Sequence, residues 1–127
     1  MRLAIAQARL GERLPGAGEV GAVLTHNGRA VCVAFNEGEL QSDPTAHAEI
    51  VAIRRACGRL KTAALRGFTL YCTLQPCGMC TIACLWAGIS RIVYGATRDA
   101  VNAVYFESRH RNTIDFIRDA FRDDLQV

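Results

Sequence analysis

The chain has 127 residues, of which 50% are apolar and 21% are charged, and this balance excludes a disordered or fibrous protein. Its length predicts one domain that buries about two thirds of its unfolded surface and needs no disulfide or metal merely to fold. No apolar run approaches the roughly 20 residues of a membrane span, and charges and a glutamine interrupt residues 1–9. We therefore expect no membrane partner, no secretory signal and a cytoplasmic location. The net charge of +3 neither requires nor excludes an RNA partner.

The N-terminal part of the chain predicts a helix followed by a β-hairpin. Residues 1–10 alternate in a way compatible with a helix, and Pro and Gly mark residues 14–18 as a loop. Two strand-like runs, 20–26 and 29–35, flank the dipeptide Asn27-Gly28. Asn-Gly is the strongest short signal for a hairpin, because both central residues of a type I′ turn need positive φ.

The middle of the chain predicts two helices separated by a strand. A polar loop at 36–44 precedes an amphipathic helix over 45–60, and residues 68–74 form a short apolar strand. A helix then runs from Pro76 to about Ala87, since proline suits the first turn of a helix, and Gly88 ends it.

The last third predicts a strand and an amphipathic helix. Residues 90–94 read as a strand, and Thr113 is a suitable N-cap for a final helix with apolar residues at helical spacing, namely Ile114, Ile117, Phe121 and Leu125. Strands that alternate with helices favour an α/β layered fold whose sheet is parallel beyond the first hairpin.

Six cysteines are more than such a fold requires. Without an export signal we expect free thiols or metal ligands rather than disulfides, and only Cys77 and Cys80 have the spacing of a ligand pair. Cys84, one helical turn after Cys80, is better placed as a core residue, as are the three other cysteines, at positions 32, 57 and 72.

Two short motifs each stand at the start of a predicted helix, and together they predict a metal site. The first is His47-Ala48-Glu49, and the second is Pro76-Cys77-Gly78-Met79-Cys80. One imidazole and two thiolates make three ligands for a tetrahedral Zn²⁺, which is the count of a catalytic site because a structural site closes with a fourth ligand. A helix N-terminus also stabilises a thiolate. The alternative is a structural zinc site or a redox pair, and we expect His26 and His110 to be solvated rather than ligands.

Glu49 lies two residues from the expected ligand His47 and is not needed as a ligand. Zinc lowers the pKa of water toward about 7, and hydroxide attack then needs a group that carries the proton to the substrate. A carboxylate at position 49 suits that role of general acid and base.

These motifs resemble the H-x-E and P-C-x-x-C signature of zinc deaminases. The chain resembles the cytidine deaminase-like superfamily from Gly21 to about Gly95. The resemblance implies a three-layer α/β/α sandwich around a mixed sheet of four to five strands. It also implies that an exocyclic amine of a base is hydrolysed to a carbonyl. Zinc would be bound by the triad His47, Cys77 and Cys80, with Glu49 as proton shuttle. Asn36 and the backbone around Ala48 would hold the base.

Two groups within the superfamily, the bacterial tRNA adenosine deaminases and the guanine deaminases, match residues 43–54, Asp-Pro-Thr-Ala-His-Ala-Glu-Ile-Val-Ala-Ile-Arg. Residues 54–57 and the pair Trp86-Ala87 resemble the guanine deaminases more. Trp86 would then stack on the base, unless it is an ordinary core aromatic. Residues 105–107 resemble a segment that closes over the base, which would make Glu107 a second carboxylate for proton transfer, unless it is a solvated acid.

The resemblance departs from the family pattern in two places. Gln75 replaces the usual glutamate before Pro-Cys, and the tail lacks the basic C-terminal helix of the tRNA-editing enzymes. The end of the chain is instead partly acidic, which is a poor phosphate-binding surface. No fifth strand is evident, so either residues 101–106 supply it or the tail packs differently, across a dimer partner for example.

We therefore expect a zinc-dependent hydrolytic deaminase of a small aminated base or nucleoside, guanine-like for example, within one domain over residues 1–127. The alternatives are a tRNA-specific adenosine-to-inosine deaminase and an inactive zinc-binding module. The resemblance also implies a homodimer.

Overall fold

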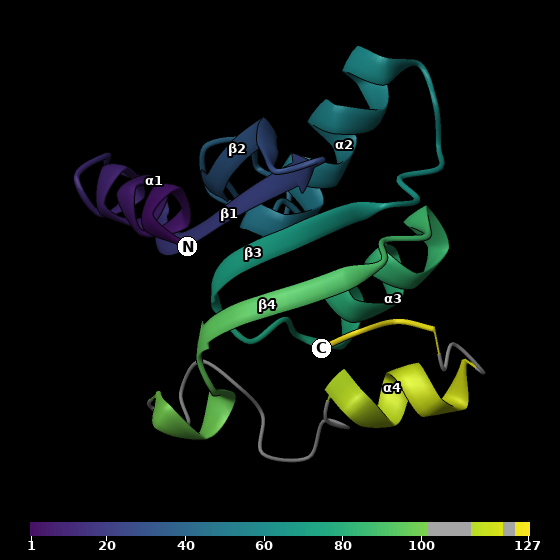
Figure 1. Cartoon of the computed structure of the whole chain (residues 1–127). Helices are drawn as coiled ribbons and strands as arrows, with labels where there is room; N and C mark the ends of the chain where they lie inside the picture. The colour runs from purple at the N-terminus through teal and green to yellow at the C-terminus, as the bar shows by residue number, and fades with distance from the viewer. Residues whose placement is uncertain (102–112, 121–123) are drawn as a thin grey trace.

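The computed structural model describes residues 1–101, 113–120 and 124–127, and Figure 1 traces the chain. Its elements, in chain order, are α1 (Arg2–Glu12), β1 (Gly18–His26), β2 (Arg29–Asn36), α2 (Ala48–Leu60), β3 (Phe68–Leu74), α3 (Gly78–Ala87), β4 (Arg91–Ala96), the short 3₁₀ helix η1 (Arg98–Ala100) and α4 (Thr113–Asp119). In the described part of the chain, no helix is both long enough and apolar enough to cross a membrane.

The four strands form one mixed sheet in the order β2-β1-β3-β4. The predicted hairpin is confirmed, because His26 pairs with Arg29 and the two turn residues both have positive φ, 50° at Asn27 and 75° at Gly28. The expectation of a parallel sheet beyond the hairpin is right for β3 and β4. The sheet is nevertheless mixed, because β3 joins β1 in the antiparallel sense.

Helices cover both faces of this sheet, as the sandwich requires (Figure 1). Gly21 faces α1 so closely that a Cβ there would lie 2.0 Å from the Ala4 carbonyl oxygen. Side chains alternate along a strand, so the next residue, Ala22, faces the other way. Ala22 lies in the main core cluster with α2 residues such as Val51 and Ala52. The chain therefore has the three-layer α/β/α fold.

Helices α2 and α3 both start later than the sequence pattern predicts. The side chain of Asp43 accepts hydrogen bonds from the Thr45 amide (2.8 Å) and hydroxyl (2.7 Å), which holds this segment in a turn. His47 is consequently extended, and α2 begins after it. Cys77 is extended in the same way before α3. The predicted end of α3 at Gly88 is confirmed by its φ of 70°.

The C-terminal helix is shorter than predicted. It ends at Asp119, and Leu125 is buried in a separate segment instead of continuing the apolar face. The next residue, Gln126, forms a parallel bridge with Arg91 on the outer edge of β4. Of the expected fifth strand over residues 101–106, all but the first residue lie outside the described residues.

Candidate metal centre and adjoining cavity

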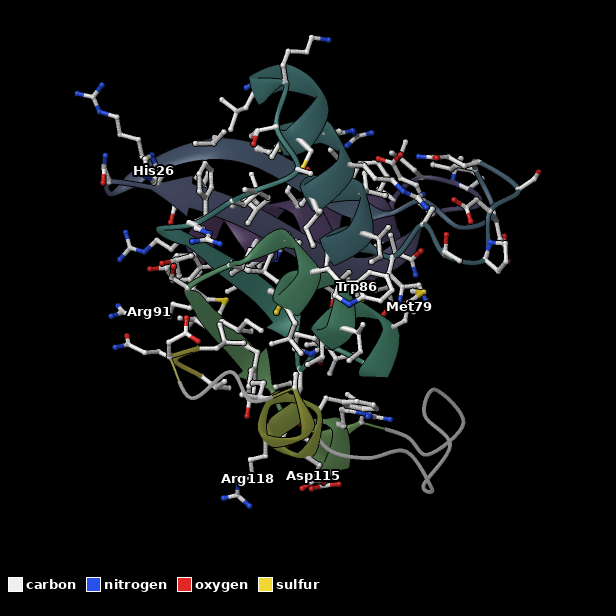
Figure 2. All side chains as sticks on the ribbon, turned by 90° about the vertical axis from the view of Figure 1, so that its right-hand side faces the viewer. His26, Met79, Trp86, Arg91, Asp115 and Arg118 are labelled. Carbon is white, nitrogen blue, oxygen red and sulfur yellow. The ribbon has the colours of Figure 1, made fainter. Side chains whose placement is uncertain are left out.

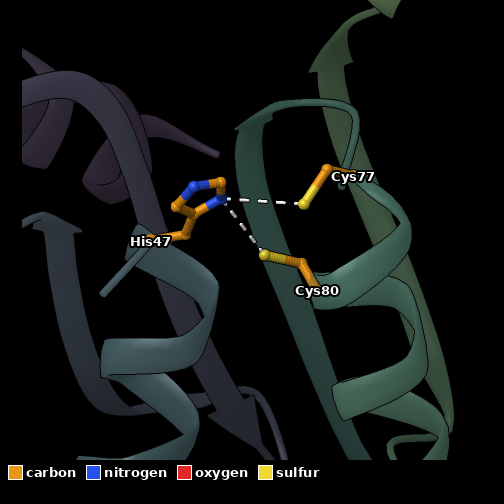
Figure 3. Close-up of side chains that lie close together, drawn as sticks. All are labelled: His47, Cys77 and Cys80. Atoms are coloured by element: carbon orange, nitrogen blue, oxygen red, sulfur yellow. Dashed lines mark hydrogen bonds between the residues drawn. The ribbon is translucent and has the colours of Figure 1, made fainter. Parts of the chain in front are cut away.

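Three donor side chains meet where the N-termini of α2 and α3 converge (Figure 3). His47 is the N-cap of α2, Cys77 is the N-cap of α3, and Cys80 lies in the first turn of α3. The Nδ1 atom of His47 is 3.6 Å from the Sγ atom of each cysteine. The three predicted ligands, which lie far apart in sequence, are therefore brought together.

The spacing of these donors fits zinc. A tetrahedral zinc with Zn–S and Zn–N bonds of the usual lengths places a nitrogen and a sulfur ligand about 3.6 Å apart. All three donor atoms lie within 4.8 Å of one another, and the described residues contain no other such group of three. Three ligands leave a fourth position open, as in a catalytic site. His47, Cys77 and Cys80 thus form a candidate zinc site.

The two thiols are in different protonation states without metal. A hydrogen bond from the Cys80 thiol, with a further one to His47, lowers the pKa of Cys77 to about 4. The same bond and burial raise the pKa of Cys80 far above its usual range. The hydrogen bond to Cys77 raises the pKa of His47. One thiolate is therefore ready to bind a cation at neutral pH.

Glu49 is a buried carboxyl group beside the triad. It is the second residue of α2, and its side chain is only 4% exposed. Burial, together with the nearby Cys77 thiolate, raises the pKa of Glu49 to about 7. A carboxyl group with a pKa near neutrality can both accept and donate a proton, which is the property of a general acid–base catalyst.

A cavity of about 650 Å³ opens beside Glu49. Asn36 and Ala48, both predicted to hold a base, line it together with His47 and Cys77. The structure therefore brings the predicted substrate-binding backbone and side chain to the same cavity as the expected proton shuttle.

Trp86 does not line this cavity. Its side chain is 86% exposed, so the interpretation as a core aromatic is wrong. Figure 2 shows it with Met79 on the outer side of α3, and both line a neighbouring groove between α2 and α3 that also reaches His47. The other predicted carboxylate, Glu107, lies outside the described residues.

The remaining cysteines and histidines are not part of the triad. Cys72 and Cys84 are buried in the core as predicted, and Cys32 and Cys57 are half-buried. His26 is not simply solvated, because its ring stacks on another aromatic side chain, Phe68, with centroids 4.5 Å apart. His110 lies outside the described residues.

Two arginines of α2 hold the loop before the site, and the sequence pattern did not reveal this. Arg54 pairs with Asp43 at 2.8 Å, while Arg55 pairs with Glu37 at 2.7 Å. Acids of the loop thus neutralise the charges of both arginines. The only signal in the sequence was the presence of acids on the loop and bases on the helix.

Gln75, the departure from the family pattern, also has a structural role. Its side-chain oxygen accepts a hydrogen bond from the backbone amide of Arg98 at 3.1 Å. The backbone amide of Gln75 donates to the Ala96 carbonyl at 2.8 Å. These bonds tie the segment before Cys77 to the end of β4.

Comparison with known proteins gives a consistent family. The profile of the cytidine and deoxycytidylate deaminase zinc-binding region matches residues 1–96. The tRNA-specific adenosine deaminase of Agrobacterium fabrum is 46% identical over 99 residues, which are 76% of this chain and 62% of that protein.

Two solved structures share the fold over most of the chain. One, from studies of A-to-I editing by tRNA:A34 deaminases at the wobble position, is 39% identical with a TM-score of 0.74, covering 88% of this chain and 90% of that one. The other, guanine deaminase from Bacillus subtilis, is 30% identical with a TM-score of 0.76, covering 91% and 71%. The chain spans 51% to 62% of the length of four curated bacterial tRNA-specific adenosine deaminases.

Proposed function

The chain belongs to the family of the cytidine and deoxycytidylate deaminase zinc-binding region. From this membership and its similarity to tRNA-specific adenosine deaminases, we propose that it is a hydrolytic deaminase that converts adenosine in a tRNA anticodon loop to inosine. The observation that carries the deaminase activity is the buried carboxyl group of Glu49 beside the zinc triad, at the wall of a cavity. We also propose one deaminase domain over residues 1–127, of which the family profile matches residues 1–96.

The choice of tRNA over a free base reverses the order expected from the sequence. That order rested on the partly acidic end of the chain and on the resemblance of residues 54–57 and of Trp86-Ala87 to guanine deaminases. Four curated relatives at 42% to 46% identity are, by contrast, tRNA-specific adenosine deaminases. A partly acidic tail weakens contacts to phosphates, but it does not alter the site that reads the base.

The proposed reaction adds water to C6 of adenine and releases the amine as ammonia. When bound by the triad, zinc supplies a Lewis acid that lowers the pKa of water toward about 7. Glu49 accepts a proton from the attacking water and delivers it to the ring nitrogen next to C6. Once the C6–O bond has formed, Glu49 takes the remaining proton from the added hydroxyl group. It transfers this second proton to the amine as the carbonyl forms and the C6–N bond breaks. A carboxyl group with a pKa of about 7 suits both transfers.

The cavity wall would orient the base. Asn36 supplies a side-chain amide, and the backbone at Ala48 and Cys77 lies at the same wall as Glu49. A base read from a tRNA must leave its stack, and the unpaired anticodon loop allows this at the least energetic cost.

The test is ammonia release and inosine formation on a panel that holds a tRNA anticodon stem-loop with adenosine at the wobble position, free adenosine, adenine, guanine and cytidine. We expect turnover of the stem-loop above all others. Turnover of a free base with none on the stem-loop would overturn the tRNA assignment. Zinc-loaded protein that turns over nothing would overturn the deaminase activity and favour the inactive zinc-binding module.

Guanine deamination is the second candidate. The solved guanine deaminase covers 91% of this chain at a TM-score of 0.76, and residues 54–57 resemble that group. The same panel decides it, because guanine would then release ammonia and form xanthine.

The groove between α2 and α3 supports a proposed homodimer. Exposed Trp86 and Met79 line it together with half-buried Ile53 and Ile82, and the groove reaches the metal centre at His47. A second copy that covers this groove would bury these apolar side chains. Trp86→Lys should then shift the molecular mass in sedimentation from two chains to one, and an unchanged mass would exclude this face as the interface.

A further inference from the structure

The loop that joins β2 to α2 carries a buried carboxylate whose role the zinc centre does not explain. Glu37 is 6% exposed, although its neighbours Glu39, Leu40 and Gln41 are exposed. Arg55 Nη2 donates to both Glu37 carboxylate oxygens, at 2.7 and 2.9 Å, and the Gln41 side chain donates to one of them. A carboxylate buried on a surface loop and paired with a helix fixes the loop relative to that helix.

Glu37 is linked through the backbone to the candidate ligand His47 and to Asn36 at the cavity. Its amide donates to the carbonyl of Ala46, the residue before the ligand His47, at 2.9 Å. It also follows Asn36 directly, and the amide of the next residue, Gly38, donates to Asn36 Oδ1 at 3.1 Å. Arg55 thus anchors Glu37, and the backbone amide of the next residue, Gly38, holds the side chain of Asn36.

This hydrogen bond determines which face of the Asn36 amide remains for a ligand. With Oδ1 taken by Gly38, the Nδ2 group lies against Gly18, where a Cβ would come within 2.7 Å of it. Asn36 and Gly18 both line the cavity beside Glu49. Asn36 therefore presents an N–H donor at the cavity wall.

We propose that Glu37, held by Arg55, is a positioning residue that keeps the Asn36 amide nitrogen directed into the cavity and so sets the affinity for the substrate base. This inference rests on the proposed function. Because Asn36 would contact the base in the ground state and the transition state alike, loss of its orientation raises KM and leaves kcat unchanged. The triad and Glu49 are untouched.

The test compares three variants of the full, zinc-loaded chain on the anticodon stem-loop. Arg55→Gln removes the charge that holds Glu37. Arg55→Lys restores it, since a single nitrogen, Nη2, makes both contacts and an ammonium group can replace it. Arg59→Gln is the matched control, because Arg59 lies one turn further on α2 and donates to the Val31 carbonyl instead of to Glu37.

We expect Arg55→Gln to raise KM about tenfold, with kcat within about twofold of the parent and the zinc content unchanged. Arg55→Lys and Arg59→Gln should keep the KM of the parent. A lower thermal stability of Arg55→Gln with an unchanged KM, or an equal rise in KM for Arg59→Gln, would overturn the inference. If Arg55→Gln does not fold, the variant Glu37→Gln is used in its place. Glutamine has nearly the same shape as glutamate, and we expect the same rise in KM.

Hydrogen exchange separates this inference from the proposed function. The amides of Glu37 and Gly38 should exchange faster in Arg55→Gln than in the parent and recover in Arg55→Lys, whether or not the protein deaminates the stem-loop. Unchanged exchange at both amides would overturn the positioning role. Absence of turnover by the parent protein overturns only the proposed function.

Discussion

Substitution of Glu49 by glutamine should stabilise the zinc-free protein at alkaline pH. Glu49 is almost completely buried, and burial raises the pKa of its carboxyl group from 4.5 to about 7. The folded chain therefore binds a proton at Glu49 more tightly than the unfolded chain does. Between these two pKa values, the free energy of unfolding falls as the pH rises.

The size of the effect follows from the pKa difference. A difference of about 2.5 pH units corresponds to about 3 kcal/mol at 1.36 kcal/mol per unit. Above pH 7 the free energy of unfolding of the parent is lowered by this full amount, whereas near pH 5 it is lowered by less than about 1 kcal/mol. Glutamine has nearly the same shape and does not ionise, so Glu49→Gln should unfold with a free energy up to about 3 kcal/mol higher than the parent at pH 8.

Urea unfolding in the presence of a chelator, at a series of pH values from 5 to 8, measures this difference. Glu39→Gln is the matched control, since Glu39 is an exposed carboxylate of the neighbouring loop. A difference between Glu49→Gln and the parent that stays constant from pH 5 to pH 8 would refute the argument that burial of an ionised carboxylate is responsible.

Two further predictions concern the metal and the packing. Cys77→Ser should reduce bound zinc from about one ion per chain to nearly none, because it removes one of three ligands, whereas Cys57→Ser should keep it; metal analysis after dialysis decides between them. Gly21→Ala should destabilise the fold by about 3 kcal/mol in urea unfolding, because the new Cβ meets the Ala4 carbonyl oxygen, which is backbone and cannot move aside. Gly58→Ala, a helical site with nothing within 4 Å of a new Cβ, should instead stabilise by about 0.5–1 kcal/mol, and an equal loss at both glycines would contradict the packing argument.

Much of the fold could be predicted because its signals are local. Asn27-Gly28 determines a two-residue turn by its own backbone preferences, and residues 68–74 form the predicted strand with the predicted bounds. The start of α2 could not be predicted in the same way. The side chain of Asp43 competes for the amide of Thr45, and a helical pattern in the sequence does not report that competition.

The metal ligands could be predicted because each motif precedes a helix, so two helix N-termini bring them together. The Glu37–Arg55 pair could not, since 18 residues separate its members and their contact depends on the path of the loop. The exposure of Trp86 could not be predicted either. Its spacing on α3 suits a core face and a partner-binding face alike, and only the position of the helix decides between them.

The rate of inosine formation by Glu49→Gln tests the central claim most directly. The zinc-loaded variant and the parent are compared on the same anticodon stem-loop, with bound zinc measured in the same samples. If Glu49 is the proton carrier of a zinc deaminase site, the variant keeps its zinc and its rate falls by about 10²–10⁴-fold. A variant that keeps its zinc and forms inosine at the rate of the parent would contradict the account.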